Sequence, residues 1–249
     1  MPDPTIQSLV AQLKRVGFRP PEQLVEQILA AGEEVLQPLL ALATDRKLLA
    51  QGGEKLLGPI HALRLLGELR SPAIIPPLLD LFPLNDETFS YDDPLLSLWE
   101  REVPQMIARA GISARDHLWS VARDAELPGW RRHVAIGALS HMPSIDPQLR
   151  EEIITGLRDI LANESDPHIV GSAVAGLGLL GARESYAQVM EAYKQKRVDT
   201  AIISPGLARQ MLLIKRSKAE MKSCAAHPLW ERYDEHGPTE QDLEDDDLD

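Results

Sequence analysis

Residues 165–194 read SDPHIVGSAVAGLGLLGARESYAQVMEAYK. Apolar residues recur there at helical spacing over 166–181 and again over 183–196, with a short Gly-Ala turn between the two runs. This spacing predicts two amphipathic helices joined by a turn. Asp166 can cap the first helix, and Pro167 then takes the first helical position, where its missing N–H costs nothing. The stretch therefore predicts one helical hairpin.

The hairpin pattern repeats along the chain. Segment 61–82, HALRLLGELRSPAIIPPLLDLF, aligns with 172–193 after a shift of 111 residues, and Leu66, Leu139 and Leu177 occupy equivalent positions in units of 36–40 residues. A lone hairpin cannot bury apolar stripes on both of its helices, so neighbouring hairpins must stack and share a core. We expect an all-α fold, an α-α superhelix in the form of a HEAT-like solenoid of about five to six helical hairpins.

Helix ends and close contacts follow from particular residues. Helices are expected at 5–16, 21–31, 33–44, 54–70, 72–83, 94–110, 113–124, 128–141, 146–162, 166–181, 183–196 and 204–222. The expected caps are Thr5, Ser71, Ser113 and Asp166, with Pro72 and Pro167 at first helical positions. Gly67, Gly176 and Gly178 should lie where a helix approaches its neighbour closely. Leu66, Leu139 and Leu177 should be buried.

Composition and charge divide the chain. Aromatic residues make up only 4% of it and the net charge is −12. Residues 231–249 hold ten acidic residues against one arginine, a net charge of −9, and have little apolar content to offset the entropy of ordering. We expect a repeat array over 1–222, with an insertion loop at 84–94, and a disordered acidic C-terminal tail over 223–249.

No targeting signal or membrane span is expected. The N-terminal MPDPTIQSLV lacks a cationic segment followed by an apolar one, and no apolar run reaches the roughly 20 residues that cross a bilayer. The single cysteine, Cys224, excludes an internal disulfide framework and a multi-cysteine zinc site. These features predict a soluble protein in the cytoplasm.

Segments 165–194 and 127–142, the latter LPGWRRHVAIGALSHM, resemble HEAT-like repeats of the phycobilisome lyase type. That pattern opens on Asp/Asn-Pro and continues with Val-Arg, a spaced Ala and Ala-Leu-Gly. Asp166-Pro167, Ala173 and Leu177-Gly178 match it, whereas Val170 stands where Arg is usual. Arg132 fills that role in the preceding unit. The resemblance covers most of residues 20–200 and implies architecture only.

Segment 17–43, GFRPPEQLVEQILAAGEEVLQPLLALA, together with 61–82, also looks like an uncharacterised bacterial family built from such helices. Members of that family often carry a cysteine-rich SEC-C metal motif at the C-terminus. This chain has only Cys224 there, so the resemblance carries no metal function over.

Chemistry-bearing motifs are missing from the sequence. Seven histidines are scattered without a His-Glu-x-x-His pair, and neither a phosphate-binding glycine loop nor a nucleophile elbow occurs. We expect no catalytic residues, no metal and no cofactor. The chain is therefore expected not to be an enzyme.

Two groups of residues are candidates for binding. Trp and Arg are favoured at contact sites, which selects a central group for a protein partner: Trp99, Arg101, Trp119, Trp130, Arg131 and Arg132. A basic patch gives segment 194–222 a net charge of +6 and is built mainly from Lys194, Lys196, Arg197, Arg209, Lys215, Arg216 and Lys218. The acidic balance of the rest of the chain opposes nucleic acid as its ligand.

The function expected from these features is a protein-binding scaffold or adaptor that uses the concave face of the solenoid. Two alternatives stay open, a chromophore-lyase-like chaperone and a HEAT-like DNA glycosylase or other nucleic-acid-binding protein. In the glycosylase alternative Asp116 and Asp124 would join the tryptophans and Arg131.

Overall fold

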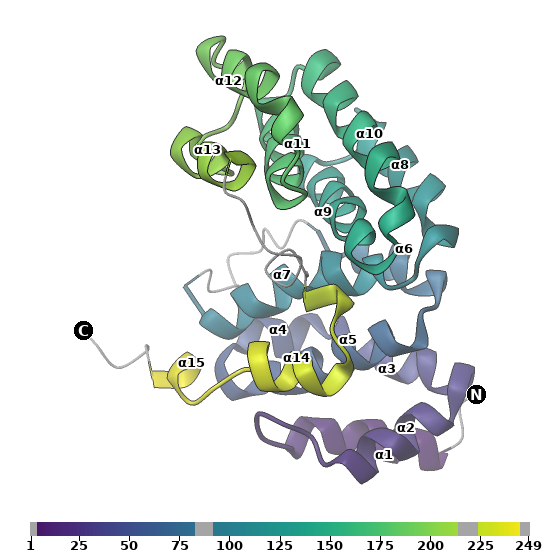
Figure 1. Cartoon of the computed structure of the whole chain (residues 1–249). Helices are drawn as coiled ribbons and strands as arrows, with labels where there is room; N and C mark the ends of the chain where they lie inside the picture. The colour runs from purple at the N-terminus through teal and green to yellow at the C-terminus, as the bar shows by residue number, and fades with distance from the viewer. Residues whose placement is uncertain (1–3, 83–91, 214–223, 245–249) are drawn as a thin grey trace. The chain divides into compact units, whose positions relative to one another are not determined.

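The computed structural model describes residues 4–82, 92–213 and 224–244 (Figure 1). The described residues form helices and turns without any strand, which confirms the all-α prediction. None of their helices is both long and apolar enough to cross a bilayer. The chain divides into two compact units, unit 1 from residues 1–110 and 227–249 and unit 2 from residues 111–226. Most of the expected insertion loop, 84–91, lies outside the described residues.

Unit 1 is organised around one central helix. Its helices are α1 (Pro4–Gln12), α2 (Glu22–Ala30), α3 (Leu36–Ala43), α4 (Arg46–Gln51), α5 (Leu57–Leu69), α6 (Ile75–Leu79), α7 (Pro94–Ala108), α14 (Leu229–His236) and α15 (Gln241–Glu244). Helices α3, α7 and α14 all pack on α5. Every residue from Leu57 to Gly67 is buried, as expected of a helix surrounded by others.

Two polar side chains on α5 are buried with their partners. The His61 ring nitrogens lie 2.8 Å from the Gly17 carbonyl oxygen and 2.9 Å from the Tyr233 hydroxyl. A neutral imidazole satisfies both if Nε2–H donates to Gly17 and Nδ1 accepts from Tyr233. The Arg64 Nε donates to Glu102 at 2.8 Å, and its guanidinium lies 4.5 Å from the centre of the Tyr233 ring.

The C-terminal segment is folded, contrary to the expected disordered tail. Residues 224–244 include α14 and α15, and α14 buries Leu229, Arg232 and Tyr233 against unit 1. The spacing of these three residues places them on one helix face. Arg232 pairs with Glu68, so a charged residue forms part of the buried face. The net charge of the segment did not reveal this buried face, because a charge count treats exposed and buried residues alike. Residues 245–249 lie outside the described residues.

Unit 2 carries the repeat pattern most clearly. Its helices are α8 (Arg115–Arg123), α9 (Gly129–Ile145), α10 (Arg150–Asn163), α11 (Pro167–Leu179), α12 (Tyr186–Lys194) and α13 (Pro205–Leu213). Helix α11 packs between α9 and α13, while α8 packs on α9 and α10 packs on α11. Leu139 and Leu177 are fully buried here, as Leu66 is in unit 1, which confirms their predicted burial.

Several predicted helix starts are confirmed. The Ser71 hydroxyl accepts from the Ala73 amide, and the Asp166 carboxylate accepts from the His168 amide at 2.9 Å. Pro72 and Pro167 follow these caps at the first helical positions. Thr5 and Ser113 lie inside helical turns instead of before them, because each helical segment begins one residue earlier than expected.

Small residues permit close helix contacts, as predicted. A Cβ added to Gly67 would lie 2.5 Å from Met106 Sδ on α7, and one added to Gly176 would lie 2.3 Å from Ser140 Oγ on α9. At Gly178 the nearest atom would be the Met211 Cβ on α13, at 3.1 Å. A methyl group at Gly67 or Gly176 therefore has no room unless the side chains that face it move.

A matched pair of glycine substitutions tests these contacts. We expect Gly176→Ala to lower the free energy of unfolding by about 1–3 kcal/mol through overpacking. Gly206→Ala should be neutral or slightly stabilising, because no atom lies within 4 Å of a Cβ added there and alanine favours the helix. Urea unfolding of both variants measures the difference; equal effects would contradict the close contact at Gly176.

Because His61 is buried on α5, we expect the stability of unit 1 to fall in acid. Burial, opposed in part by the Gly17 hydrogen bond and reinforced by Arg64, lowers the pKa of His61 to about 4. Because the unfolded histidine titrates near 6.5, unfolding takes up a proton between these pH values, and stability falls as the pH drops through that window. The loss attributable to His61 should reach at most about 3 kcal/mol at pH 4.

The measurement is urea unfolding of the natural protein and of His61→Gln from pH 7 to pH 4. Burial also lowers the pKa of His133 and His141 to about 4, so both proteins should lose stability in acid. The difference between them isolates His61. Parallel pH dependences in the two proteins would show that His61 is not the group that titrates.

Candidate binding surface

The three tryptophans grouped by the sequence do not form one surface. Trp99 lies fully buried on α7 in unit 1, and its ring stacks on Phe82 with centroids 6.1 Å apart. Trp119 is buried on α8 in unit 2, with the Arg123 guanidinium 4.7 Å from its ring centre. Trp130 is 48% exposed. Of the three, only Trp130 presents an aromatic surface to a partner.

Trp130 belongs to a cluster of three rings in unit 2. It is the second residue of α9, and His133 follows one turn later on the same helix. His168 is the second residue of α11. The Trp130 ring centre lies 4.7 Å from that of His168 and 5.7 Å from that of His133, with both rings edge-on to the indole. The two imidazole centroids are 5.4 Å apart, so both rings contact the indole from neighbouring directions and restrict its movement.

The two histidines are linked through one serine. His133 Nδ1 lies 2.8 Å from Ser172 Oγ, and the Ser172 hydroxyl donates to the His168 carbonyl oxygen at 2.8 Å. Because that hydroxyl proton is used, Ser172 must accept from His133, which places the His133 proton on Nδ1. Burial and the neighbouring His168 lower the pKa of His133 to about 4. His133 is therefore neutral at pH 7.

Two carboxylates lie beside the ring cluster. Asp166 caps α11 through the amide of His168 at 2.9 Å. Asp199, after α12, has its Oδ2 3.7 Å from His168 Nδ1, and its amide donates to the Pro167 carbonyl at 2.9 Å. The surface around Trp130 thus combines an aromatic ring with negative charge.

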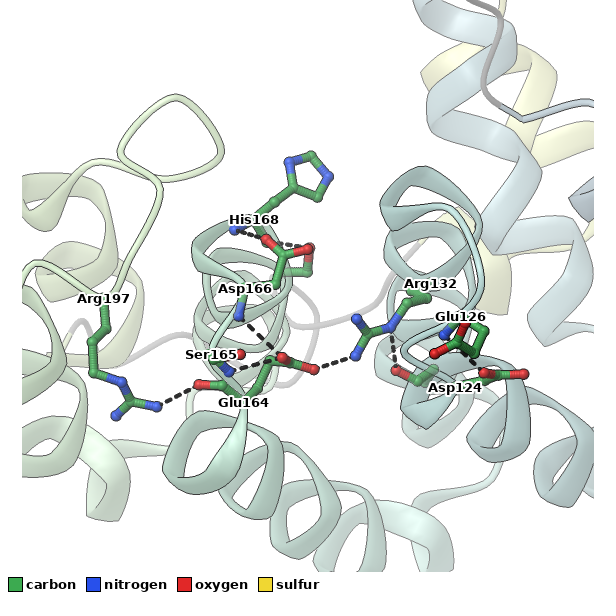
Figure 2. Close-up of polar contacts among 10 residues, drawn as sticks. Asp124, Glu126, Arg132, Glu164, Ser165, Asp166, His168 and Arg197 are labelled. Atoms are coloured by element: carbon green, nitrogen blue, oxygen red, sulfur yellow. Dashed lines mark hydrogen bonds and ion pairs between the residues drawn. The ribbon is translucent and has the colours of Figure 1, made fainter.

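Arg132 holds this region together, contrary to its expected role as a contact residue. Its side chain is buried and donates from Nε to the Ala122 carbonyl oxygen at 3.0 Å. Its Nη2 pairs with Glu164, whose other oxygen accepts from the amides of Ser165 and Asp166 (Figure 2). Arg132 therefore connects the end of α8 to the loop that precedes α11.

The ionisation of Glu164 agrees with its pairing with Arg132. Burial opposes its ionisation, but the Asp166 amide and the Arg132 guanidinium outweigh burial and lower its pKa. Arg197, expected in the basic patch, donates to the Glu164 carbonyl oxygen at 2.7 Å (Figure 2). It also donates to the Leu161 carbonyl oxygen at 3.0 Å. Arg197 thus caps the carbonyl end of α10.

The remaining candidates are spread over several sites. Arg101 is exposed on α7 in unit 1, while Arg131 is half-buried beside Trp130 in unit 2. Lys194 pairs with Glu191 at 3.5 Å, and Lys196 and Arg209 are exposed. Three members of the expected basic patch lie outside the described residues: Lys215, Arg216 and Lys218.

Sequence reasoning missed the ring cluster, although a signal for it was present. Trp130 and His168 are 38 residues apart, and Leu139 and Leu177 are separated by the same number. Equivalent positions of stacked repeats face one another. Applying the 38-residue repeat spacing to the helix starts would have paired Trp130 with His168.

No protein-family model matches the chain, and comparison with curated proteins finds no significant match.

The contacts of Arg132 with Ala122 and Glu164, here called the arginine clamp, predict very different stability losses for substitutions of two adjacent arginines. We expect Arg132→Ala to cost about 3–5 kcal/mol, because it leaves Glu164 partly buried without its cation and the Ala122 carbonyl without its donor. Arg131→Ala should cost less than about 1 kcal/mol. Thermal and urea unfolding measure both; a mild Arg132→Ala effect would show that the clamp is dispensable.

Proposed function

We propose that this chain is a non-enzymatic protein-binding scaffold of the HEAT-like solenoid type, and that the surface around Trp130 is where it contacts its partner. The observation that carries the proposal is the half-exposed indole, held edge-on by His133 and His168. A fixed, exposed aromatic ring loses little conformational entropy on binding, which makes tryptophan a preferred contact residue.

The solenoid part of the proposal rests on repeat order. In unit 2, α9, α11 and α13 pack in sequence order, and each of the first two packs against the helix that precedes it in the chain. Stacked hairpins of this kind offer extended surfaces that bind other proteins. A cytoplasmic location belongs to the same proposal, supported by the single cysteine of the chain.

The chemistry beside Trp130 favours a partner segment with an arginine or lysine. The indole face attracts a cation, and the carboxylates of Asp166 and Asp199 add negative charge next to it. His133 is neutral at pH 7 because its pKa is about 4, so it contributes no positive charge. A basic side chain would be attracted by both features at once.

The same facts disfavour the nucleic-acid alternative. A glycosylase-like site needs several aromatic and acidic residues on one basic face, but Trp99 and Trp119 are buried in different units. Arg197 is engaged with the carbonyl groups of α10, and Lys194 with Glu191. Of the four described patch residues, Lys196 and Arg209 thus remain for phosphate, fewer than a sustained positive surface needs.

A photo-crosslinking amino acid at position 130 provides the test. The expected result is a discrete crosslinked partner from the native host, identified by mass spectrometry and then produced in pure form. Binding of that purified partner should weaken by at least about 1.4 kcal/mol, or tenfold, in Trp130→Ala. Asp166 is left unchanged because it caps α11.

The matched control is Leu207→Ala, which removes another exposed large apolar side chain of unit 2. It should leave the affinity unchanged, and both variants should unfold like the natural protein. An equal loss in the two variants, or no loss in Trp130→Ala, would contradict a specific contact at Trp130.

A further inference from the structure

A cluster of histidines and carboxylates lies on the C-terminal segment of unit 1. His227 Nδ1 is 3.3 Å from Glu235 Oε2 and 3.5 Å from Glu231 Oε2, and His236 Nε2 is 3.8 Å from Glu235 Oε2. Ligand atoms of His227, Glu235 and His236 all lie within 4.8 Å of one another. Three possible metal ligands therefore face a common point, with a fourth beside them.

Helix geometry explains the grouping. Glu231 and Glu235 are four residues apart in α14, which places them along one helix face. His227 lies just before α14, and His236 is its last residue. The imidazole rings of the two histidines meet at that face with centroids 5.7 Å apart.

The His227 ring supplies a second, independent observation. Its Nδ1 is buried and has no hydrogen-bond partner among the described residues, although two carboxylate oxygens lie within 3.5 Å of it. Buried polar atoms in proteins almost always have a partner. His227 Nδ1 lies close to two carboxylate oxygens but forms a hydrogen bond with neither. Metal ligands have this arrangement, because each points at the ion between them and not at one another.

The distances fit a tetrahedral ion. Zinc binds histidine nitrogen and carboxylate oxygen at about 2.0–2.2 Å, which places neighbouring ligand atoms about 3.3–3.5 Å apart. The two contacts of His227 Nδ1, at 3.3 and 3.5 Å, agree with this spacing. The His236 contact is wider, and ligand atoms of the group lie up to 4.8 Å apart, so the exposed side chains of Glu235 and His236 must move by up to about 1.3 Å (4.8 minus 3.5 Å) to reach this spacing.

We infer that His227, Glu235 and His236 form a binding site for a divalent transition-metal ion, Zn²⁺ in particular, with Glu231 or water as the fourth ligand. Two imidazoles favour zinc over calcium or magnesium, which prefer all-oxygen sites. The inference is independent of the partner surface, because all four residues belong to unit 1 and Trp130 to unit 2.

Metal binding would fix both ends of α14. Arg109 donates to the His227 carbonyl oxygen at 3.3 Å, and Arg64 donates to the His236 carbonyl oxygen at 2.7 Å. The ion would join the side chains of the same two residues. An eight-residue helix has little stability by itself, so this link would hold the C-terminal segment against α5 and α7.

The test is titration of the tag-free full-length chain with Zn²⁺ by calorimetry, and with Co²⁺ by visible absorption. We expect one ion per chain, the intense d–d bands of tetrahedral cobalt, and a Zn²⁺-dependent rise in melting temperature. Glu235→Gln and His236→Gln should each weaken binding roughly tenfold or more, since each removes a direct ligand. Both side chains are exposed, so these variants should fold.

His117→Gln is the matched control, because His117 is an exposed histidine of unit 2. It should bind Zn²⁺ like the natural protein. The inference is overturned if the chain binds no Zn²⁺, if Glu235→Gln and His236→Gln bind it as before, or if His117→Gln abolishes binding. Purified-partner binding by Trp130→Ala tests the proposed function separately, so either idea can fail alone.

Discussion

Buried carbonyl groups at helix ends are the constraint on which this structure depends. A helix leaves its last carbonyls without intrahelical partners, and leaving such a group unsatisfied in a packed interior costs about 1–3 kcal/mol. Arginines from neighbouring elements meet this need repeatedly: Arg109 at Gly67, Arg132 at Ala122, Arg150 at Leu180 and Arg197 at Leu161. These four arginines are thus parts of the packing, and their charges are a poor guide to ligands.

The same constraint fixes one side chain of α9. Arg132 points inward to reach the Ala122 carbonyl and Glu164. Trp130 lies two residues earlier, in the first turn of α9, and its ring is 48% exposed. Val134, two residues after Arg132, is buried, so the exposure of the indole goes with its place at the start of the helix.

Periodicity predicted the all-α fold and the burial of Leu66, Leu139 and Leu177, because the spacing of apolar residues on a helix reports burial directly. Residue type alone gave wrong contact residues where a side chain suited to binding is buried. Trp99 and Arg132 suit a binding surface by composition, yet both are buried, since a large ring fills a core and an arginine caps a helix. Residue type selected Trp130, and the 38-residue repeat spacing would have added His168 to it had it been applied to the helix starts.

The C-terminal segment shows why charge counting failed. Arg232 and Glu68 are 164 residues apart, so no local pattern announces their pairing. Glu68 also accepts from Arg109 at 2.7 Å, and one carboxylate thus serves two buried or nearly buried guanidinium groups. Removing α14 would take Arg232 away from Glu68 and the Tyr233 ring away from Arg64, and buried charges are costly to leave without their partners. On α14 the acidic residues Glu231, Asp234 and Glu235 are exposed, whereas Leu229, Arg232 and Tyr233 are buried, so part of what composition presents as a tail is the outer surface of a packed helix.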